Sequence, residues 1–212
     1  MKSELEILRE LWTGFSATPL AIRLQQTMRA LILPYNDLLK WLPAAPTMLD
    51  IGCGAGAFIY LARKGRDKTR MTGVDAPAPV RVAREVNPDA RHAFVANTNF
   101  EDWPAEPVDC VTLIDVMHHV HPAVQNAFFE AALSRVRPGG TLVYKDMAAQ
   151  PLVPAWINRI HDLLSARQWI RYYPLDAVKS ALAGGGFKTR HEARIWRGPY
   201  LHELLVAERA AS

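Results

Sequence analysis

Cysteine is scarce in this chain, and its scarcity limits how the fold can be stabilised. The 212 residues include two cysteines, Cys53 and Cys110, which are too few for a disulfide framework. Half of the residues are hydrophobic and 22% are charged, so a chain of this length can bury a substantial core without cross-links or metal. The two thiols therefore fit small buried side chains in a reducing compartment.

Long apolar runs and blocks of like charge are also missing. No apolar run reaches the roughly 20 residues that a membrane span needs, and the first residues lack the basic and apolar regions of a signal peptide. We therefore expect a cytoplasmic protein with no membrane span. The net charge of +4 is scattered along the chain, and without a run of like charges we expect no nucleic-acid partner.

Linkers of low complexity, fixed-period repeats and a second glycine-rich turn are absent as well. We therefore predict a single domain over residues 1–212, with a helical cap at 1–45 and a core at 46–212. Apolar residues at helical spacing support the cap between Ser3 and Leu42. Pro34 and Pro43 punctuate it, because proline disfavours helical backbone at the residue before it.

The most informative feature present is a glycine-rich turn, Leu49-Asp50-Ile51-Gly52-Cys53-Gly54-Ala55-Gly56. An apolar run precedes it, which indicates a strand that turns tightly into a helix. Glycine suits such a turn because a Cβ hinders positive φ angles and close approach to a ligand. The glycines alone also fit a dinucleotide fingerprint. Asp50 changes the interpretation, since a carboxylate repels a pyrophosphate but attracts the cationic amino-acid end of a sulfonium cofactor.

Further landmarks follow in order along the chain. A second strand, Arg70–Asp75, ends in a carboxylate about 25 residues after Asp50, near the spacing at which an acidic side chain meets ribose hydroxyls. An apolar run at Val108–Asp115 indicates a central strand buried on both faces. The remaining expected elements are a strand at Ala93–Ala96, a turn and strand at Arg137–Tyr144, a helix at Leu175–Ala183, and a hairpin of Phe187–Trp196 and Tyr200–Ala207.

Taken together, these motifs resemble the class I S-adenosylmethionine (SAM)-dependent methyltransferases of the small-molecule type, over about Thr47 to Glu208. The resemblance implies a Rossmann-like α/β fold whose seven-stranded sheet is mostly parallel with one antiparallel strand. It implies SAM as cofactor and S-adenosylhomocysteine as product. The cofactor contacts it implies are Asp50, Gly52, Cys53, Gly54, Gly56, Asp75, Ala76, Asn97, Thr98 and Asp115. Asn97 departs from the family's commoner aspartate, although its amide oxygen can accept the same hydrogen bond.

The stretch Asp115-Val116-Met117-His118-His119-Val120-His121 carries the candidate catalytic residues. In a helical turn Asp115 and His119 would share a face, and a carboxylate beside an imidazole raises its basicity. We therefore predict His119 as general base, with His118 as second choice. The alternative is that a histidine packs beneath the cofactor. No CxxC or carboxylate pair completes a ligand set around the histidines, so we expect no metal.

An acceptor-side helical insertion is predicted at about 151–172, with a helix at Val153–Leu164. His161 is a further candidate for the same pocket, and a flat apolar acceptor is compatible with four aromatic residues there, Trp156, Trp169, Tyr172 and Tyr173. Core packing explains such residues equally well.

The histidine cluster favours methylation of a hydroxyl, because a phenol with a pKa near ~10 becomes a better nucleophile when a base removes its proton. We therefore predict O-methylation of a small hydroxylated acceptor, of which an aromatic one is compatible with the chain. Three alternatives remain open: N- or C-methylation, a nicotinamide-dependent oxidoreductase, and a noncatalytic SAM-binding protein. The sequence does not fix the oligomeric state.

Overall fold

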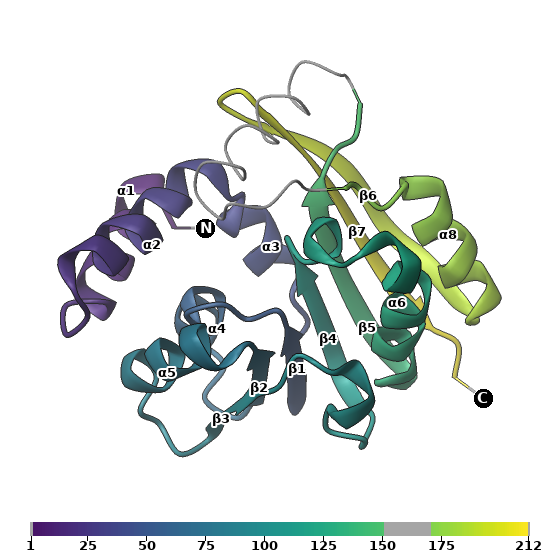
Figure 1. Cartoon of the computed structure of the whole chain (residues 1–212), viewed down its shortest axis with the longest axis horizontal. Helices are drawn as coiled ribbons and strands as arrows, with labels where there is room; N and C mark the ends of the chain where they lie inside the picture. Colours follow the sequence, from purple (N-terminus) through teal and green to yellow (C-terminus); the bar gives the residue numbers. More distant parts are fainter. Residues whose placement is uncertain (1, 151–170, 212) are drawn as a thin grey trace. The chain divides into compact units, whose positions relative to one another are not determined.

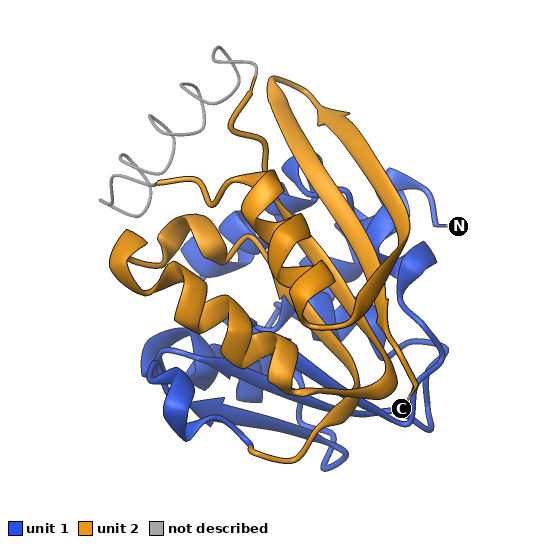
Figure 2. Cartoon of the chain, turned by 90° about the vertical axis from the view of Figure 1, so that its right-hand side faces the viewer, with its two compact units in different colours: residues 1–104 blue, residues 105–212 orange. Residues whose placement is uncertain are grey.

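The computed structural model describes residues 2–150 and 171–211. The chain forms two compact units, which are Met1–Pro104 and Ala105–Ser212 (Figure 2). Each is described by itself below, as unit 1 and unit 2. The predicted helix Val153–Leu164, and with it Trp156, His161 and Trp169, lies outside the described residues.

Seven strands form one mixed sheet in the order β3-β2-β1-β4-β5-β7-β6 (Figure 1). The pairs β1–β2, β2–β3 and β4–β5 are parallel, whereas β7 is antiparallel to both β5 and β6. The predicted α/β fold, with a mostly parallel sheet and one antiparallel strand, is confirmed. The strands are β1 (Thr47–Ile51), β2 (Arg70–Asp75), β3 (His92–Ala96), β4 (Val108–Ile114), β5 (Val136–Met147), β6 (Phe187–Arg197) and β7 (Tyr200–Arg209).

Unit 1 begins with the predicted helical region, which is three helices: α1 (Glu4–Gly14), α2 (Leu20–Ile32) and α3 (Tyr35–Trp41). Ser3 and Glu6 form a reciprocal capping box at the start of α1, which satisfies two backbone donors of its first turn. Pro19 and Pro34 precede α2 and α3 as their N-cap residues. Behind the glycine turn follow α4 (Ala57–Ala62), α5 (Pro77–Val86) and the short 3₁₀ helix η1 (Phe100–Asp102).

The described residues of unit 2 form the helices α6 (Gln125–Ser134) and α8 (Leu175–Gly184) and the 3₁₀ turns η2 (Met117–His119) and η3 (Pro122–Val124). The register between β4 and β5 shifts, because Val108 pairs with Val136 whereas Cys110 pairs with Thr141. The predicted turn at Arg137–Gly140 is therefore a bulge inside β5. Phe129 of α6 and Tyr144 of β5 pack edge to face at 5.8 Å between ring centroids, and both are buried.

Among the described helices, none is both long enough and apolar enough to cross a membrane.

Candidate active site

The glycine turn of unit 1 has the backbone that its sequence predicts. Gly52, Gly54 and Gly56 have φ angles of 77°, 56° and 78°, a region that side chains with a Cβ rarely adopt. The amide groups of Gly52 and Cys53 both donate to the carbonyl oxygen of Val74, at 2.8 and 3.2 Å. These bonds hold the turn against β2, and Gly56 then serves as the N-cap of α4.

Asp75, at the end of β2, reaches back to this turn. Its Oδ2 accepts a hydrogen bond from the amide of Gly54 at 2.7 Å, and its Oδ1 accepts one from the amide of Ala76 at 2.6 Å. Asp50 is buried on β1, 2% exposed. The structure thus brings the second carboxylate onto the glycine turn, and its role toward ribose stays a prediction.

Cys53 lies within the turn as a protonated, buried thiol. Burial raises the pKa of Cys53 well above its usual range, and the nearby carboxylates of Asp50 and Asp75 raise it further. A Cβ added to Gly73 would come within 2.8 Å of the Cys53 sulfur and 2.9 Å of the Phe94 ring. The thiol is therefore a small space-filling group behind the turn, with no nucleophilic character at neutral pH.

Asn97 and Thr98 follow β3, as the sequence predicts. The backbone amide of Asn97 donates to the backbone carbonyl oxygen of Asp75 at 2.9 Å, which connects this loop to the end of β2. The side-chain oxygen of Asn97 accepts from the amide of Asn99 at 2.9 Å. This oxygen has a second lone pair, which can accept a further hydrogen bond.

Asp115 lies at the end of β4 in unit 2 and has an unusual backbone. Its φ angle of 56° is positive, and among the described residues other than glycine it is alone in this respect. Such a conformation costs on the order of 1–3 kcal/mol and persists where the surroundings enforce it. Here the Asp115 amide donates to the carbonyl oxygen of Lys145 at 2.9 Å, and its Oδ1 accepts from the Lys145 ammonium at 2.5 Å. Lys145 is fully buried, so this ion pair fixes the chain where β4 ends.

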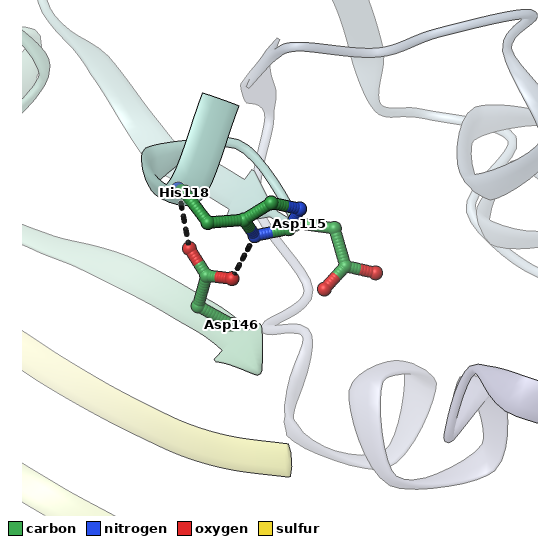
Figure 3. Close-up of side chains that lie close together, drawn as sticks. All are labelled: Asp115, His118 and Asp146. Carbon is green, nitrogen blue, oxygen red and sulfur yellow. Dashed lines mark hydrogen bonds and ion pairs between the residues drawn. The ribbon is translucent and has the colours of Figure 1, made fainter. Parts of the chain in front are cut away.

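His118, in η2, pairs with Asp146 of β5. Its Nδ1 forms a very short contact with Oδ1 of Asp146, and its backbone amide donates to Oδ2 of the same carboxylate at 3.3 Å (Figure 3). A carboxylate at Nδ1 selects the tautomer with the proton on Nδ1, in which Nε2 is the basic ring nitrogen. Asp146 therefore orients His118 as a carboxylate orients a general base.

The structure pairs His118 with Asp146, whereas the sequence spacing indicates a pair of Asp115 and His119. Residues 117–119 form a 3₁₀ turn, and Asp115 has left-handed backbone, so the α-helical turn that would place Asp115 and His119 on one face does not form. His119 is exposed, with its ring centroid 4.1 Å from that of His118. Lys145 and Asp146 were absent from the predicted site. The sequence pattern that could have identified these two residues is a pair of charges at the end of an apolar strand.

Asp115, His118 and Asp146 each offer a ligand atom within 4.8 Å of the others, which raises the question of a metal. The Lys145 ammonium already lies on Asp115, and Asp146 accepts from the His118 ring and also from the Met147 amide at 2.7 Å. A cation would compete with each of these donors. The chemistry of the set is that of a buried hydrogen-bonded ion-pair network, and our expectation of no metal stays a prediction.

A depression of about 450 Å³ adjoins the histidines, lined by His118, His119, Val120, His121, Pro122, Ala123 and Arg171. Gln125 stabilises its wall, because its side-chain amide donates to the carbonyl oxygens of Met117 and Arg171 at 2.9 and 3.0 Å. The Nδ1 of His121 accepts from the Ala123 amide at 3.3 Å, so His121 caps η3. Tyr173 donates its hydroxyl to Asn126 at 3.0 Å, which gives this aromatic residue a packing role.

The sequence places the chain in a family. A family model described as a methyltransferase domain matches residues 22–192, and the chain belongs to this family, the class I SAM-dependent methyltransferases. Demethylspheroidene O-methyltransferase from Rhodobacter capsulatus is similar, with 24% identity over 170 residues that cover 78% of this chain and 42% of that protein. The chain therefore spans less than half the length of this curated relative.

Solved structures show the same fold. An O-methyltransferase family protein from Burkholderia thailandensis matches with a TM-score of 0.76 and 19% identity, over 93% of this chain and 62% of that one. The magnesium protoporphyrin IX methyltransferase of Synechocystis PCC 6803, solved with bound S-adenosylhomocysteine, matches with a TM-score of 0.70 and 15% identity, over 94% and 93% of the two chains.

Proposed function

We propose that this chain transfers the methyl group of SAM to a hydroxyl group of a small-molecule acceptor and releases S-adenosylhomocysteine. The observation that carries the O-methylation proposal is the Asp146–His118 pair, because a hydroxyl gains most from a base. Family membership argues against the nicotinamide-dependent oxidoreductase, and the oriented histidine argues against a noncatalytic role.

The turn of unit 1 fits the cofactor by its shape and charge. A Cβ added to Gly54 would meet no protein atom nearer than Nη1 of Arg29 at 3.9 Å, so the space beside this glycine is open to a ligand. In this proposal Asp50 receives the cationic amino group, Asp75 the ribose hydroxyls and Asn97 the adenine amino group. When bound, SAM supplies a methyl group on a positively charged sulfur.

We assign the general base to His118 in place of His119, because Asp146 holds His118 in the tautomer that a base requires. In the proposed step the acceptor hydroxyl would give its proton to Nε2 of His118, and its oxygen would take the methyl group as the carbon–sulfur bond breaks and leaves its electron pair on sulfur. The Asp146 carboxylate stabilises the imidazolium that results. His119, exposed beside it, is the alternative base.

The test is a screen of small hydroxylated compounds with methyl-labelled SAM, followed by variants on the compound that turns over. His118→Ala should retain cofactor affinity and lose roughly 10²–10⁴-fold in kcat, the usual range for a positioned base. Its deficit should shrink as pH rises toward the acceptor's own pKa, because solvent then supplies the deprotonated nucleophile.

His119→Ala is the matched control, since it removes the neighbouring ring and leaves the Asp146 pair. A large loss in His119→Ala with normal turnover in His118→Ala would return the base to His119. Normal turnover in both variants would refute a histidine base. A labelled N- or C-methyl product would refute O-methylation while leaving the methyltransferase assignment intact.

A further inference from the structure

A row of charged side chains crosses three strands of unit 2 and ends at the proposed base. Strands β5, β7 and β6 lie side by side in this order (Figure 1). Asp146 of β5 lies directly opposite Glu203 of β7, and Glu203 lies directly opposite Arg194 of β6. Directly opposite residues of antiparallel strands share a face, with Cβ atoms about 4.5–5.5 Å apart. Since Asp146 also holds His118, the order of the row is His118, Asp146, Glu203 and Arg194.

Glu203 is a carboxylate with little access to water. It is 7% exposed, and its Oε1 accepts a hydrogen bond from Nη2 of Arg194 at 2.9 Å. Burial raises the pKa of Glu203 above its usual range, the charge of Arg194 opposes this increase, and the charge of Asp146 adds to it. The Arg194 guanidinium, whose side chain is 56% exposed, therefore favours the ionised form of Glu203.

The position of Glu203 opposite Asp146 opposes folding. Like charges directly opposite on neighbouring strands destabilise a sheet, and an uncharged side chain at position 203 would avoid this repulsion. Departures of this kind from the rules of stable packing are expected where they serve a function. Here the second negative charge lies next to the carboxylate that orients His118, and a nearby negative charge favours the protonated form of an imidazole.

We propose that Glu203 is a positioning residue for the base: acting through Asp146, its negative charge stabilises the imidazolium form of His118, and Arg194 limits the size of this effect. The inference rests on the proposed function, in which His118 takes the proton of the acceptor hydroxyl. An imidazole that holds a proton more strongly is a stronger general base. Glu203 thereby increases the basicity that Asp146 alone gives to His118.

Other charged and titratable side chains also surround the His118–Asp146 pair. The negative charge of Asp115 is paired with the buried ammonium of Lys145, and Tyr144 stays neutral because burial raises its pKa well above the usual value. The remaining groups of this kind on neighbouring described elements are His119, His121, Arg171, Tyr173, Glu192 and His202. All of these groups are the same in each variant below, so the differences between variants isolate the charges of the row.

NMR titration of the histidine rings in the full chain, without cofactor or acceptor, tests the proposal. The signal that disappears in His118→Ala identifies His118. Glu203→Gln keeps the size of the side chain and removes its charge, so the pKa of His118 should fall by about 0.5–1 unit. Arg194→Met breaks the same ion pair but removes a positive charge, so in this variant the pKa of His118 should not fall.

The matched control is Glu208→Gln, because Glu208 of β7 pairs with Arg190 of β6 at 2.7 Å in the same hairpin. This control should leave the pKa of His118 unchanged. An unchanged pKa in Glu203→Gln would overturn the proposal. An equal fall in Arg194→Met would also overturn it, because loss of the ion pair would then act through structure and not through charge.

Turnover of His118→Ala judges the proposed function separately from this titration. Normal turnover in that variant would refute His118 as the base. An unchanged titration in Glu203→Gln, with a large loss of turnover in His118→Ala, would refute the role of Glu203 alone.

Discussion

Lys145 and Asp146 are adjacent in sequence, yet each holds a different residue of the segment that follows β4. Lys145 pairs with Asp115, and Asp146 pairs with His118. The segment is therefore held at two points by the end of β5, and ligand atoms of Asp115, His118 and Asp146 lie within 4.8 Å of one another. Two independent contacts explain how Asp115 is kept in a left-handed conformation.

The histidines of this site were predictable from sequence, and their partners were not. An apolar strand that runs into Asp115 and three histidines identifies the carboxyl edge of a parallel sheet. Asp146 lies 28 residues after His118, and its position depends on the register that pairs Ile114 with Lys145. That register follows from packing across two strands, which spacing within one segment does not encode.

Substitutions at Asp75 separate its two functions in the turn. Asp75→Ala removes both the acceptor for the Gly54 amide and the proposed ribose ligand, so SAM affinity should fall by about 1.5–3 kcal/mol or more. Asp75→Asn retains one acceptor oxygen and should cost less. Isothermal titration calorimetry measures both, and an affinity within error of the unmodified protein in Asp75→Ala would move the ribose ligand elsewhere.

His92 gives the fold a dependence on pH. It is 8% exposed, and among the described residues neither ring nitrogen has a hydrogen-bond partner. Burial lowers its pKa below the usual 6.5, so as pH falls below ~6.5 the unfolded chain binds a proton that the folded chain does not. The free energy of unfolding should therefore decrease as pH falls through this range and be unaffected by His92 at higher pH.

Urea unfolding at neutral and mildly acidic pH measures this effect. His92→Leu should reduce the slope of stability against pH, because the side chain that binds a proton only in the unfolded chain is removed. An unchanged slope in His92→Leu would contradict the assignment.

At the scale of elements, a strand end marked by turn residues was predicted correctly, whereas the length of β5 was not. The strand Arg70–Asp75 has the predicted bounds, because it ends on a carboxylate and Pro77 follows two residues later. β5 is longer than its prediction: the Arg137–Gly140 turn is absorbed as a bulge, and the strand continues past Tyr144 through charged residues. Strands are expected to end where polarity rises, whereas here Lys145 and Asp146 are buried, the first paired with Asp115 and the second with His118.

Two glycines with similar backbone angles allow the stability cost of backbone strain to be distinguished from the cost of steric overlap. Gly56 and Gly65 have φ angles of 78° and 81°. A Cβ on Gly56 would lie 2.7 Å from the Asn87 amide nitrogen and 3.0 Å from the Ala83 Cβ, whereas a Cβ on Gly65 would meet nothing within 4 Å. Gly65→Ala should therefore cost about 1–2 kcal/mol of stability from strain, and Gly56→Ala about 1–3 kcal/mol more from overpacking at the start of α4.

Chemical denaturation of the two variants side by side tests this difference. Equal losses would mean that α5 yields to the added methyl group.

The whole chain combines two compact units with one strand order. The single domain predicted over 1–212 remains a prediction. The family and the sheet were predictable, because several motifs in fixed order identify them together. The acceptor was not, since the predicted insertion at about 151–172 lies mostly outside the described residues, and the side chains that select an acceptor vary independently of the fold.

Cofactor binding should be visible in the thermal stability of the whole chain. SAM at about 100 times its Kd should stabilise the folded state by about 2.7 kcal/mol, which raises Tm by roughly 5–10 °C for a chain of this size. Gly54→Val should abolish the shift, because the side chain fills the open space beside the turn. Gly139→Val is the control, since it imposes a similar strain at φ 74° in unit 2. A shift with NAD(H) and none with SAM would refute the cofactor assignment.

The strand order has a consequence for how the chain is made. β6 leaves the ribosome before β7, yet β7 lies between β5 and β6 in the sheet. Until β7 pairs, β6 has no strand to join and β5 keeps one open edge. An open edge is a template for pairing with other chains. The pairing of β7 with both neighbours is therefore the step that closes this part of the sheet to other chains.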